Sequence, residues 1–154
     1  MLARAMGTDE MKVLLADDDR LLTHMIASRL RANGHEVIVA HDAIQAWTAA
    51  IRNIPDAIVL DIQMPGGTGL AVLKQLKTST KTSHIPVIVL SGSLEPELAA
   101  AMVKKLGADE YHPKPLDLKL LLASLSRMAN IPVETPKEPG MLLNDPLSTA
   151  TAKS

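Results

Sequence analysis

The chain of 154 residues contains no cysteine and no phenylalanine, and it has one tryptophan and one tyrosine. Without cysteine there is neither a disulfide nor a thiolate zinc site, which agrees with a reducing cytoplasm. With so few aromatic rings, stacking on bases or sugars is a poor explanation for any function. The chain also lacks an apolar run near the roughly 20 residues that a membrane helix needs. We therefore expect a cytoplasmic protein with no membrane partner.

Neither basic nor acidic residues are in excess: the chain has 16 basic and 17 acidic residues, and its formal net charge is −1. This balance argues against a protein that binds nucleic acid through general basicity, so no direct nucleic-acid binding is expected. Apolar residues make up 47% of the chain. Its length leaves room for one domain with one hydrophobic core.

Composition divides the chain into three parts. Residues 1–10 carry no signal-peptide pattern and are expected to be a disordered leader. Residues 11–129 hold the regular patterns of a folded domain. Residues 130–154 contain four prolines among Ser, Thr, Lys and Glu, without sustained periodicity. That composition predicts a flexible tail or linker.

Short apolar runs alternate with segments of helical spacing across residues 11–129. The runs are Val13–Ala16, Val37–Ala40, Ala57–Leu60 and Val87–Leu90, with a fifth, more polar run around Asp109–His112. Runs that are apolar throughout are typical of strands covered on both faces. The alternation predicts an α/β fold, a single doubly wound domain of five βα units with a parallel sheet and helices on both faces.

The segments between the runs also predict which helix faces are buried and where helices begin and end. Asp42, with Gln45 three residues later, resembles a capping box, and Gly34 and Gly107 lie where helices should stop. The apolar residues at helical spacing predict four buried faces: Leu22, Met25, Ile26 and Leu30; Ile44, Trp47 and Ile51; Leu98, Met102 and Leu106; and Leu118, Leu121, Leu122, Leu125 and Met128.

Polar residues follow the predicted strands at the points where parallel sheets of this type bind ligands. Asp17, Asp18 and Asp19 follow the first strand, and Asp61, Ser91 and Lys114 follow the third, fourth and fifth strands. Taken singly, each has an ordinary structural explanation, such as an acidic helix N-terminus or a solvated lysine. Four chemically matched residues at the ends of four strands are hard to assemble by chance.

Together these side chains predict a site for phosphoryl transfer. Closely packed carboxylates favour a bound cation, and Mg²⁺ prefers oxygen ligands. A metal and an ammonium can neutralise charge on a transferring phosphoryl group, while an aspartate acts as the nucleophile.

Four segments resemble the receiver domains of bacterial two-component response regulators, in the class of the chemotaxis regulator. They are Val13–Asp19, Ile58–Pro65, Val87–Gly92 and Gly107–Pro115. The resemblance covers about residues 11–129. It implies a sheet of order 2-1-3-4-5 and a cis peptide between Lys114 and Pro115. Asp19 matches no role in the family and is expected to cap a helix.

The resemblance implies a phosphorylation-controlled switch in which Asp61 accepts a phosphoryl group from a phosphohistidine donor. Asp18 would contact Mg²⁺ directly and Asp17 largely through water, and Asp61 and the backbone carbonyl of Gln63 would complete the site. Lys114 would pair first with Asp61 and later with a phosphoryl oxygen.

Ser91 and Tyr111 match the family's switch pair, which would change the surface of the fourth helix, fifth strand and fifth helix. The resemblance classes the chain as a switch that catalyses its own phosphorylation and dephosphorylation, and not as an enzyme. Implied partners are a histidine kinase or histidine phosphotransfer protein, an unknown downstream effector and, in the phosphorylated form, a second copy of the chain.

Two alternatives stay open. In a haloacid-dehalogenase-type phosphatase Asp17 would be the nucleophile and Asp19 the acid or base; against this, Asp61 would have no role, and the acidic pair Asp109 and Glu110 precedes Lys114. A pseudo-receiver would be an interaction module that never takes phosphate, but all the expected charged groups are present.

Overall fold

A computed structural model of the chain describes residues 10–92 and 95–129. Its central element is one parallel sheet of β1 (Lys12–Ala16), β2 (Glu36–Ala40), β3 (Ala57–Asp61), β6 (Val87–Ser91) and β7 (Glu110–Pro113). The strands lie in the order β2-β1-β3-β6-β7. Because β6 and β7 are the fourth and fifth strands of this sheet along the chain, the predicted order 2-1-3-4-5 is confirmed.

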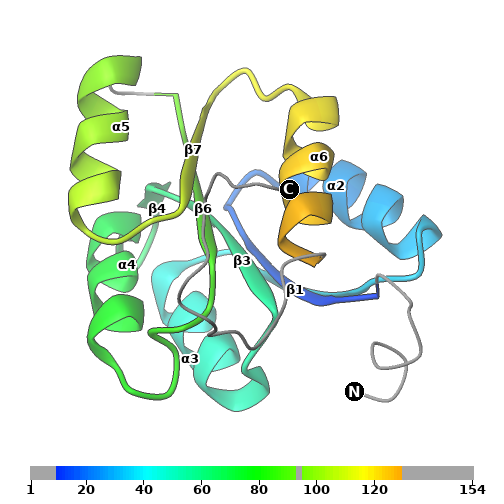
Figure 1. Ribbon diagram of the computed structural model, residues 1–154, viewed down its shortest axis with the longest axis horizontal. Coiled ribbons are helices and arrows are strands. Elements are labelled where there is room, and N and C mark those ends of the chain that lie inside the picture. The colour runs from blue at the N-terminus through cyan, green and yellow to red at the C-terminus, as the bar shows by residue number, and fades with distance from the viewer. Residues whose placement is uncertain (1–9, 93–94, 130–154) are drawn as a thin grey trace, which may run out of the picture.

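Helices cover both faces of the sheet (Figure 1). They are α2 (Arg20–Ala32), α3 (Ala43–Asn53), α4 (Gly69–Thr78), α5 (Pro96–Lys105) and α6 (Leu118–Ala129). One core cluster joins α2 and α6 to the sheet, and a second cluster joins α3, α4 and α5 to its other face. The predicted doubly wound α/β fold is therefore confirmed.

The inner strands are the most deeply buried, as their apolar sequences predict. Every residue of β3 and β6 is buried, whereas the edge strands β2 and β7 are partly exposed. A strand with neighbours on both sides and a helix layer on each face has no route to water, so its side chains must be apolar. Polar side chains of these two strands therefore occur only at their last residues, Asp61 and Ser91.

Between β3 and α4 the chain forms a small antiparallel hairpin of β4 (Gln63–Met64) and β5 (Gly67–Thr68). Gly66 and Gly67 have φ values of 82° and 129°, a backbone region that strongly favours glycine. These glycines therefore allow the tight turn that joins β4 to β5. Thr68 caps α4 by accepting a hydrogen bond from the Ala71 N–H at 3.1 Å.

The predicted helix boundaries are confirmed. Asp19 caps α2 by accepting from the Leu22 N–H at 3.0 Å, and Asp42 caps α3 by accepting from the Gln45 N–H at 2.8 Å. Gly34 follows the end of α2 with a φ of 91°, and Gly107 follows α5 with a φ of 99°. Local rules of capping suffice at these positions because the interacting groups are close in sequence.

Two predicted helix faces are only partly correct: Trp47 of α3 and Leu106 at the end of α5 pack against the core as predicted, but one bulky residue of each face does not. In α3 the side chain of Ile44 is 69% exposed, and Ala43, Ala46 and Ala50 form the buried stripe. In α5 Leu98 is 54% exposed and its neighbour Ala99 is buried. Both errors have one cause: the bulkiest residues were taken as the buried face, whereas small alanines let a helix approach the sheet closely.

The face predicted for α2 is correct for Ile26 and Leu30, but Met25 is 48% exposed. The face predicted for α6 is confirmed, because Leu121 and Leu125 are buried and Leu118, Leu122 and Met128 pack against the same core. Within the described ranges, no helix is both long enough and apolar enough to cross a membrane. Nearly all of the predicted leader and all of the predicted tail lie outside these ranges.

Candidate functional site

The carboxyl ends of four parallel strands bring the predicted polar residues to one edge of the sheet. Asp17 and Asp18 directly follow β1, and Asp61 is the last residue of β3. Ser91 is the last residue of β6, and Lys114 directly follows β7. Side chains from four distant parts of the sequence thus meet because parallel strands end at a common edge.

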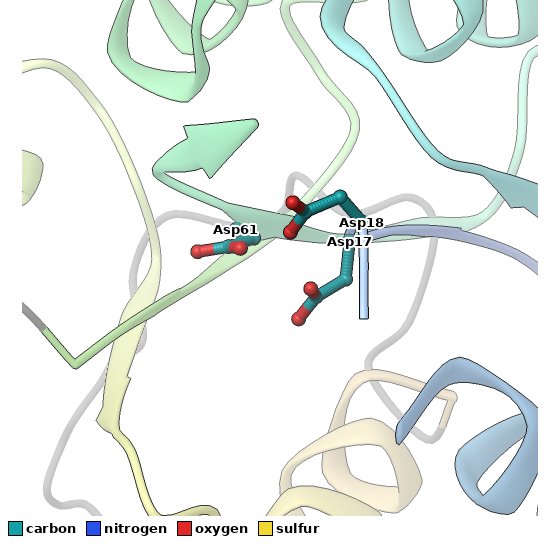
Figure 2. A group of neighbouring side chains, drawn as sticks. All are labelled: Asp17, Asp18 and Asp61. Atoms are coloured by element: carbon teal, nitrogen blue, oxygen red, sulfur yellow. The ribbon is translucent and has the colours of Figure 1, made fainter. Parts of the chain in front are cut away.

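Three carboxylates form the acidic cluster of this site, defined as Asp17, Asp18 and Asp61. Each offers one oxygen atom, and these three oxygens lie within 4.8 Å of one another. Figure 2 shows all three carboxylates extending to the same side of the strand ends. Asp17 is fully buried and Asp61 is 3% exposed, whereas Asp18 is exposed. The cluster therefore has two buried members and one that faces solvent.

Backbone amides orient the two buried carboxylates. Oδ1 of Asp17 accepts a hydrogen bond from the Asp19 N–H at 2.9 Å. Oδ1 of Asp61 accepts one from the Gln63 N–H at 3.1 Å. In both cases the donor lies two residues further along, so the turn after each strand holds its carboxylate in place. The second oxygen of each carboxylate is left for other partners.

Lys114 places a positive charge beside the Oδ2 atoms of Asp17 and Asp61. Its Nζ lies 2.9 Å from Oδ2 of Asp17 and 3.4 Å from Oδ2 of Asp61. The predicted pairing with Asp61 is present, and the closer contact with Asp17 adds to it. The predicted cis peptide between Lys114 and Pro115 is confirmed. Burial alone would lower the pKa of Lys114, but Asp17 and Asp61 outweigh burial and raise that pKa above 10.5.

Burial dominates the chemistry of Asp61. The loss of water around its carboxylate raises the pKa of Asp61 from 3.8 to about 6. The hydrogen bond from Gln63 lowers this pKa, the nearby charge of Asp17 raises it, and Lys114 lowers it. Without a further cation, the ionised form of Asp61 is therefore held at a high free energy.

The donor set fits a hard divalent cation. The three carboxylates carry more negative charge than the Lys114 ammonium neutralises. Oδ2 of Asp17 is buried and, among the described residues, has no hydrogen bond of ordinary geometry, although Lys114 pairs with it electrostatically. Clustered carboxylate oxygens with one member open to solvent suit Mg²⁺, which keeps several waters. Asp17, Asp18 and Asp61 are thus the residues that could hold such an ion.

Ser91 and Tyr111, predicted as a pair, lie next to each other. The Tyr111 hydroxyl donates a hydrogen bond to the backbone carbonyl of Ser91 at 3.3 Å. The Lys114 N–H donates to the same carbonyl at 2.8 Å. Ser91 is fully buried and Tyr111 is half-buried. One peptide carbonyl at the end of β6 therefore links the lysine of the site to the tyrosine of β7.

Two glycines matter to the site in a way that the sequence did not predict. A Cβ atom on Gly69 would lie 2.1 Å from the backbone carbonyl oxygen of Asp61, so only glycine lets α4 begin there. A Cβ atom on Gly92 would lie 3.1 Å from Cβ of Lys114. A glycine at the first position of a helix is a signal that could have been read, but its partner is distant in sequence.

Comparison with known proteins identifies the family of this chain. The family described as "Response regulator receiver domain" matches residues 13–126, and the chain belongs to it. The protein named response regulator MprA from Mycobacterium avium is 36% identical over 115 residues, which cover 75% of this chain and 49% of that protein. The chain spans about half the length of the curated relatives it matches.

Solved structures give the same result. The receiver domain of the Francisella response regulator 1452 has a TM-score of 0.71 and 32% identity, and the match covers 77% of this chain and 96% of that one. The chemotaxis response regulator CheY4 of Vibrio cholerae has a TM-score of 0.70 and 30% identity, and the match covers 76% and 97% of the two chains. Receiver domains are phosphorylation-controlled signalling switches rather than enzymes in the usual sense, and they bind Mg²⁺ through an acidic cluster.

Proposed function

We propose that this receiver domain carries its phosphoryl group on Asp61. The observation that supports the proposal is the position of the Asp61 carboxylate, 3.4 Å from the Lys114 ammonium and grouped with Asp17 and Asp18. A nucleophilic oxygen, a fixed cation and a candidate metal site then converge on one point. Asp19 is occupied as the cap of α2 and has no such surroundings.

In the proposed reaction an oxygen of Asp61 attacks the phosphorus of a phosphohistidine on a donor protein. The new P–O bond forms as the P–N bond breaks, and the departing imidazole nitrogen takes up a proton. Lys114 neutralises part of the negative charge on the phosphoryl oxygens. The donor is a histidine kinase or histidine phosphotransfer protein, because response regulators work with histidine kinases and downstream effectors.

Asp17, Asp18, Asp61 and the backbone carbonyl of Gln63 are the proposed ligands of Mg²⁺. When bound, the ion supplies positive charge against the transferring phosphoryl group. We assign catalysis of phosphorylation and dephosphorylation to the domain itself, since the charged groups of the site all come from its own strand ends.

The switch runs from Ser91 to the surface of α5, β7 and α6. The Ser91 hydroxyl donates to a phosphoryl oxygen, and Tyr111 then changes its position, which shifts the population of two surface states. The hydrogen bond between Tyr111 and the Ser91 carbonyl supports this coupling. A downstream effector or a second phosphorylated copy would read the altered surface. Response regulators are generally cytoplasmic, and we extend that location to this chain.

The test is to incubate the full chain with acetyl phosphate and Mg²⁺ and to map the modified residue by mass spectrometry. We expect one phosphoryl group on Asp61, lost in Asp61→Asn and when EDTA removes the metal. Asp19→Asn is the matched control, because asparagine caps helices as well as aspartate does and phosphorylation should persist.

Three outcomes would contradict this assignment. A phosphoryl group on Asp17 would favour the phosphatase alternative over the receiver function. So would the loss of phosphorylation in the Asp19→Asn variant. If neither acetyl phosphate nor beryllofluoride with Mg²⁺ changes the chain, the domain is an interaction module of the pseudo-receiver kind.

A further inference from the structure

A pocket separate from the acidic cluster lies between α2 and the edge strand β2. Its volume is about 290 Å³, and its lining includes Arg20, His24 and Arg31 from α2 and His41 from the segment after β2. None of these four side chains belongs to the proposed phosphorylation site. We call this cavity, with these four residues, the basic pocket.

Helical spacing explains why the basic pocket exists. Arg20, His24, Ala27 and Arg31 are separated by four, three and four positions, so they lie along one face of α2. Ala27 is buried and forms an apolar floor together with Val39 of β2, while the two arginines are exposed at the rim. The pocket thus combines a small apolar base with a cationic margin.

The surrounding carboxylates are engaged elsewhere. Asp19 caps α2 and Asp42 caps α3 through their side chains. Glu36 alternates with Val37 along β2, and Val37 belongs to the core under α2, so the Glu36 side chain is on the opposite face of the sheet. Of the residues that the structure describes, none with a carboxylate lines the pocket.

Hydrogen bonds hold two members of the basic pocket in place. Nη2 of Arg31 donates to the backbone carbonyl of Val37 at 3.0 Å, which leaves most of the N–H groups of its guanidinium for other acceptors. Nδ1 of His41 lies 3.0 Å from the backbone carbonyl oxygen of Asp17 and must donate, because a carbonyl only accepts. Groups fixed in advance lose less entropy when a ligand binds.

We propose that the basic pocket binds a small phosphate monoester. Arginine guanidinium groups match the geometry of phosphate oxygens, and two of them flank this cavity. The volume lies near the lower end of the range for pockets that hold a whole small molecule, about 300 Å³, so the ester's organic part can rest on Ala27 and Val39. His41 lines the pocket, and its Nδ1 donates to the backbone carbonyl of Asp17. A ligand in the pocket is therefore connected to the acidic cluster through the side chain of His41.

The experiment is a titration of the ¹⁵N-labelled full chain with glycerol 3-phosphate at constant ionic strength, followed by amide chemical shifts. EDTA is present throughout, so that no metal recruits the anion to Asp61. We expect saturable shifts confined to residues 20–41. The double variant Arg20→Gln/Arg31→Gln should weaken binding by about tenfold or more, since it removes both arginines that line the pocket.

Arg29→Gln is the matched control, because Arg29 is an exposed arginine of the same helix that does not line the pocket. It should bind as the wild type does, and glycerol should cause no saturable shift. Binding that both arginine variants weaken equally, or shifts that grow linearly without saturation, would overturn the proposal. So would a phosphoserine peptide that binds more tightly than glycerol 3-phosphate with the same dependence on Arg20 and Arg31. None of these results depends on phosphorylation of Asp61.

Discussion

Lys114 contacts two carboxylates at once, and this sharing shapes the site at the scale of single residues. Its Nζ is closer to Asp17, at 2.9 Å, than to Asp61, at 3.4 Å. Asp17 therefore neutralises part of the positive charge of Lys114, and less of that charge remains to offset the negative charge of the Asp61 carboxylate. The raised pKa of Asp61, at about 6, is the electrostatic result, with burial as its largest cause.

Stability in the absence of metal should depend on Asp61 and on pH. Because the pKa of Asp61 is raised from 3.8 to about 6, the folded state holds its proton more tightly than the unfolded state does. The favourable contribution is complete below pH 3.8 and is lost as the pH rises through 6. At about 1.4 kcal/mol per pH unit, the loss amounts to roughly 3 kcal/mol.

We therefore expect Asp61→Asn to stabilise the metal-free protein at pH 7.5 by about 1–3 kcal/mol, with a smaller gain at pH 4. Urea unfolding followed by circular dichroism in EDTA measures this difference. Asp42→Asn serves as control, since asparagine keeps the helix cap and no large change should follow. An equal gain at both pH values would contradict the electrostatic explanation.

Gly69 is the residue on which the approach of α4 to β3 depends. Gly69→Ala would place a Cβ atom 2.1 Å from the Asp61 carbonyl oxygen and 2.6 Å from Cα of Ile62, both of which are backbone atoms. We expect a loss of about 2–4 kcal/mol in the free energy of unfolding, together with slower phosphorylation, because the end of β3 must move.

Gly34→Ala is the comparison for this substitution. Nothing lies within 4 Å of the added atom, and only the φ of 91° opposes it. A loss of about 1 kcal/mol is expected there, with phosphorylation unchanged. If the two variants lose equal stability, the close contact at Gly69 is not the cause.

At the scale of elements, a polar cluster joins β7 to α6. Glu110 of β7 accepts hydrogen bonds from Ser124 and Arg127 of α6, and His112 contacts both Glu110 and Ser124. Burial by itself raises the pKa of Glu110, but the hydrogen bonds outweigh it and lower that pKa below 4.5. The cluster fixes α6 against the strand that carries Tyr111.

Ser124→Ala should weaken this junction. The share of stability that Glu110 contributes is present above pH 4.5 and disappears as the pH falls through its lower folded-state pKa. We expect the variant to be less stable by about 1 kcal/mol at pH 7, with the difference narrowing in acid. Chemical unfolding at several pH values measures it. Ser126→Ala, an exposed serine of the same helix, should show no such loss.

The helix caps and the buried face of α6 could be predicted from sequence, but the rotation of α3 and α5 could not. Asp19 and Asp42 cap helices as expected because a cap involves groups within three residues of each other. Which side of α3 faces the sheet depends on how closely the sheet lies, and that distance is set by distant residues. The exposed Ile44 is the visible consequence.

At the scale of the whole molecule, the two core clusters formed by the described residues run from Met11 to Ala129. We therefore propose residues 11–129 as the complete receiver domain. A chain cut to these residues should unfold cooperatively, with a midpoint close to that of the full chain, and should still be phosphorylated on Asp61. Calorimetry and the acetyl phosphate assay test both expectations. A non-cooperative transition would show that the fold needs residues outside this range.

The sequence by itself determined the α/β class, the helix caps and the set of charged residues that follow the strands. These features depend on local hydrogen bonding and on the alternation of apolar runs. Only the tertiary structure decided that Lys114 lies nearer to Asp17 than to Asp61, that Gly69 must be glycine, and that the two arginines of α2 share a pocket with His41. The physical reason is that distances between side chains from different strands and helices follow from how closely the layers pack, and no local pattern encodes that packing.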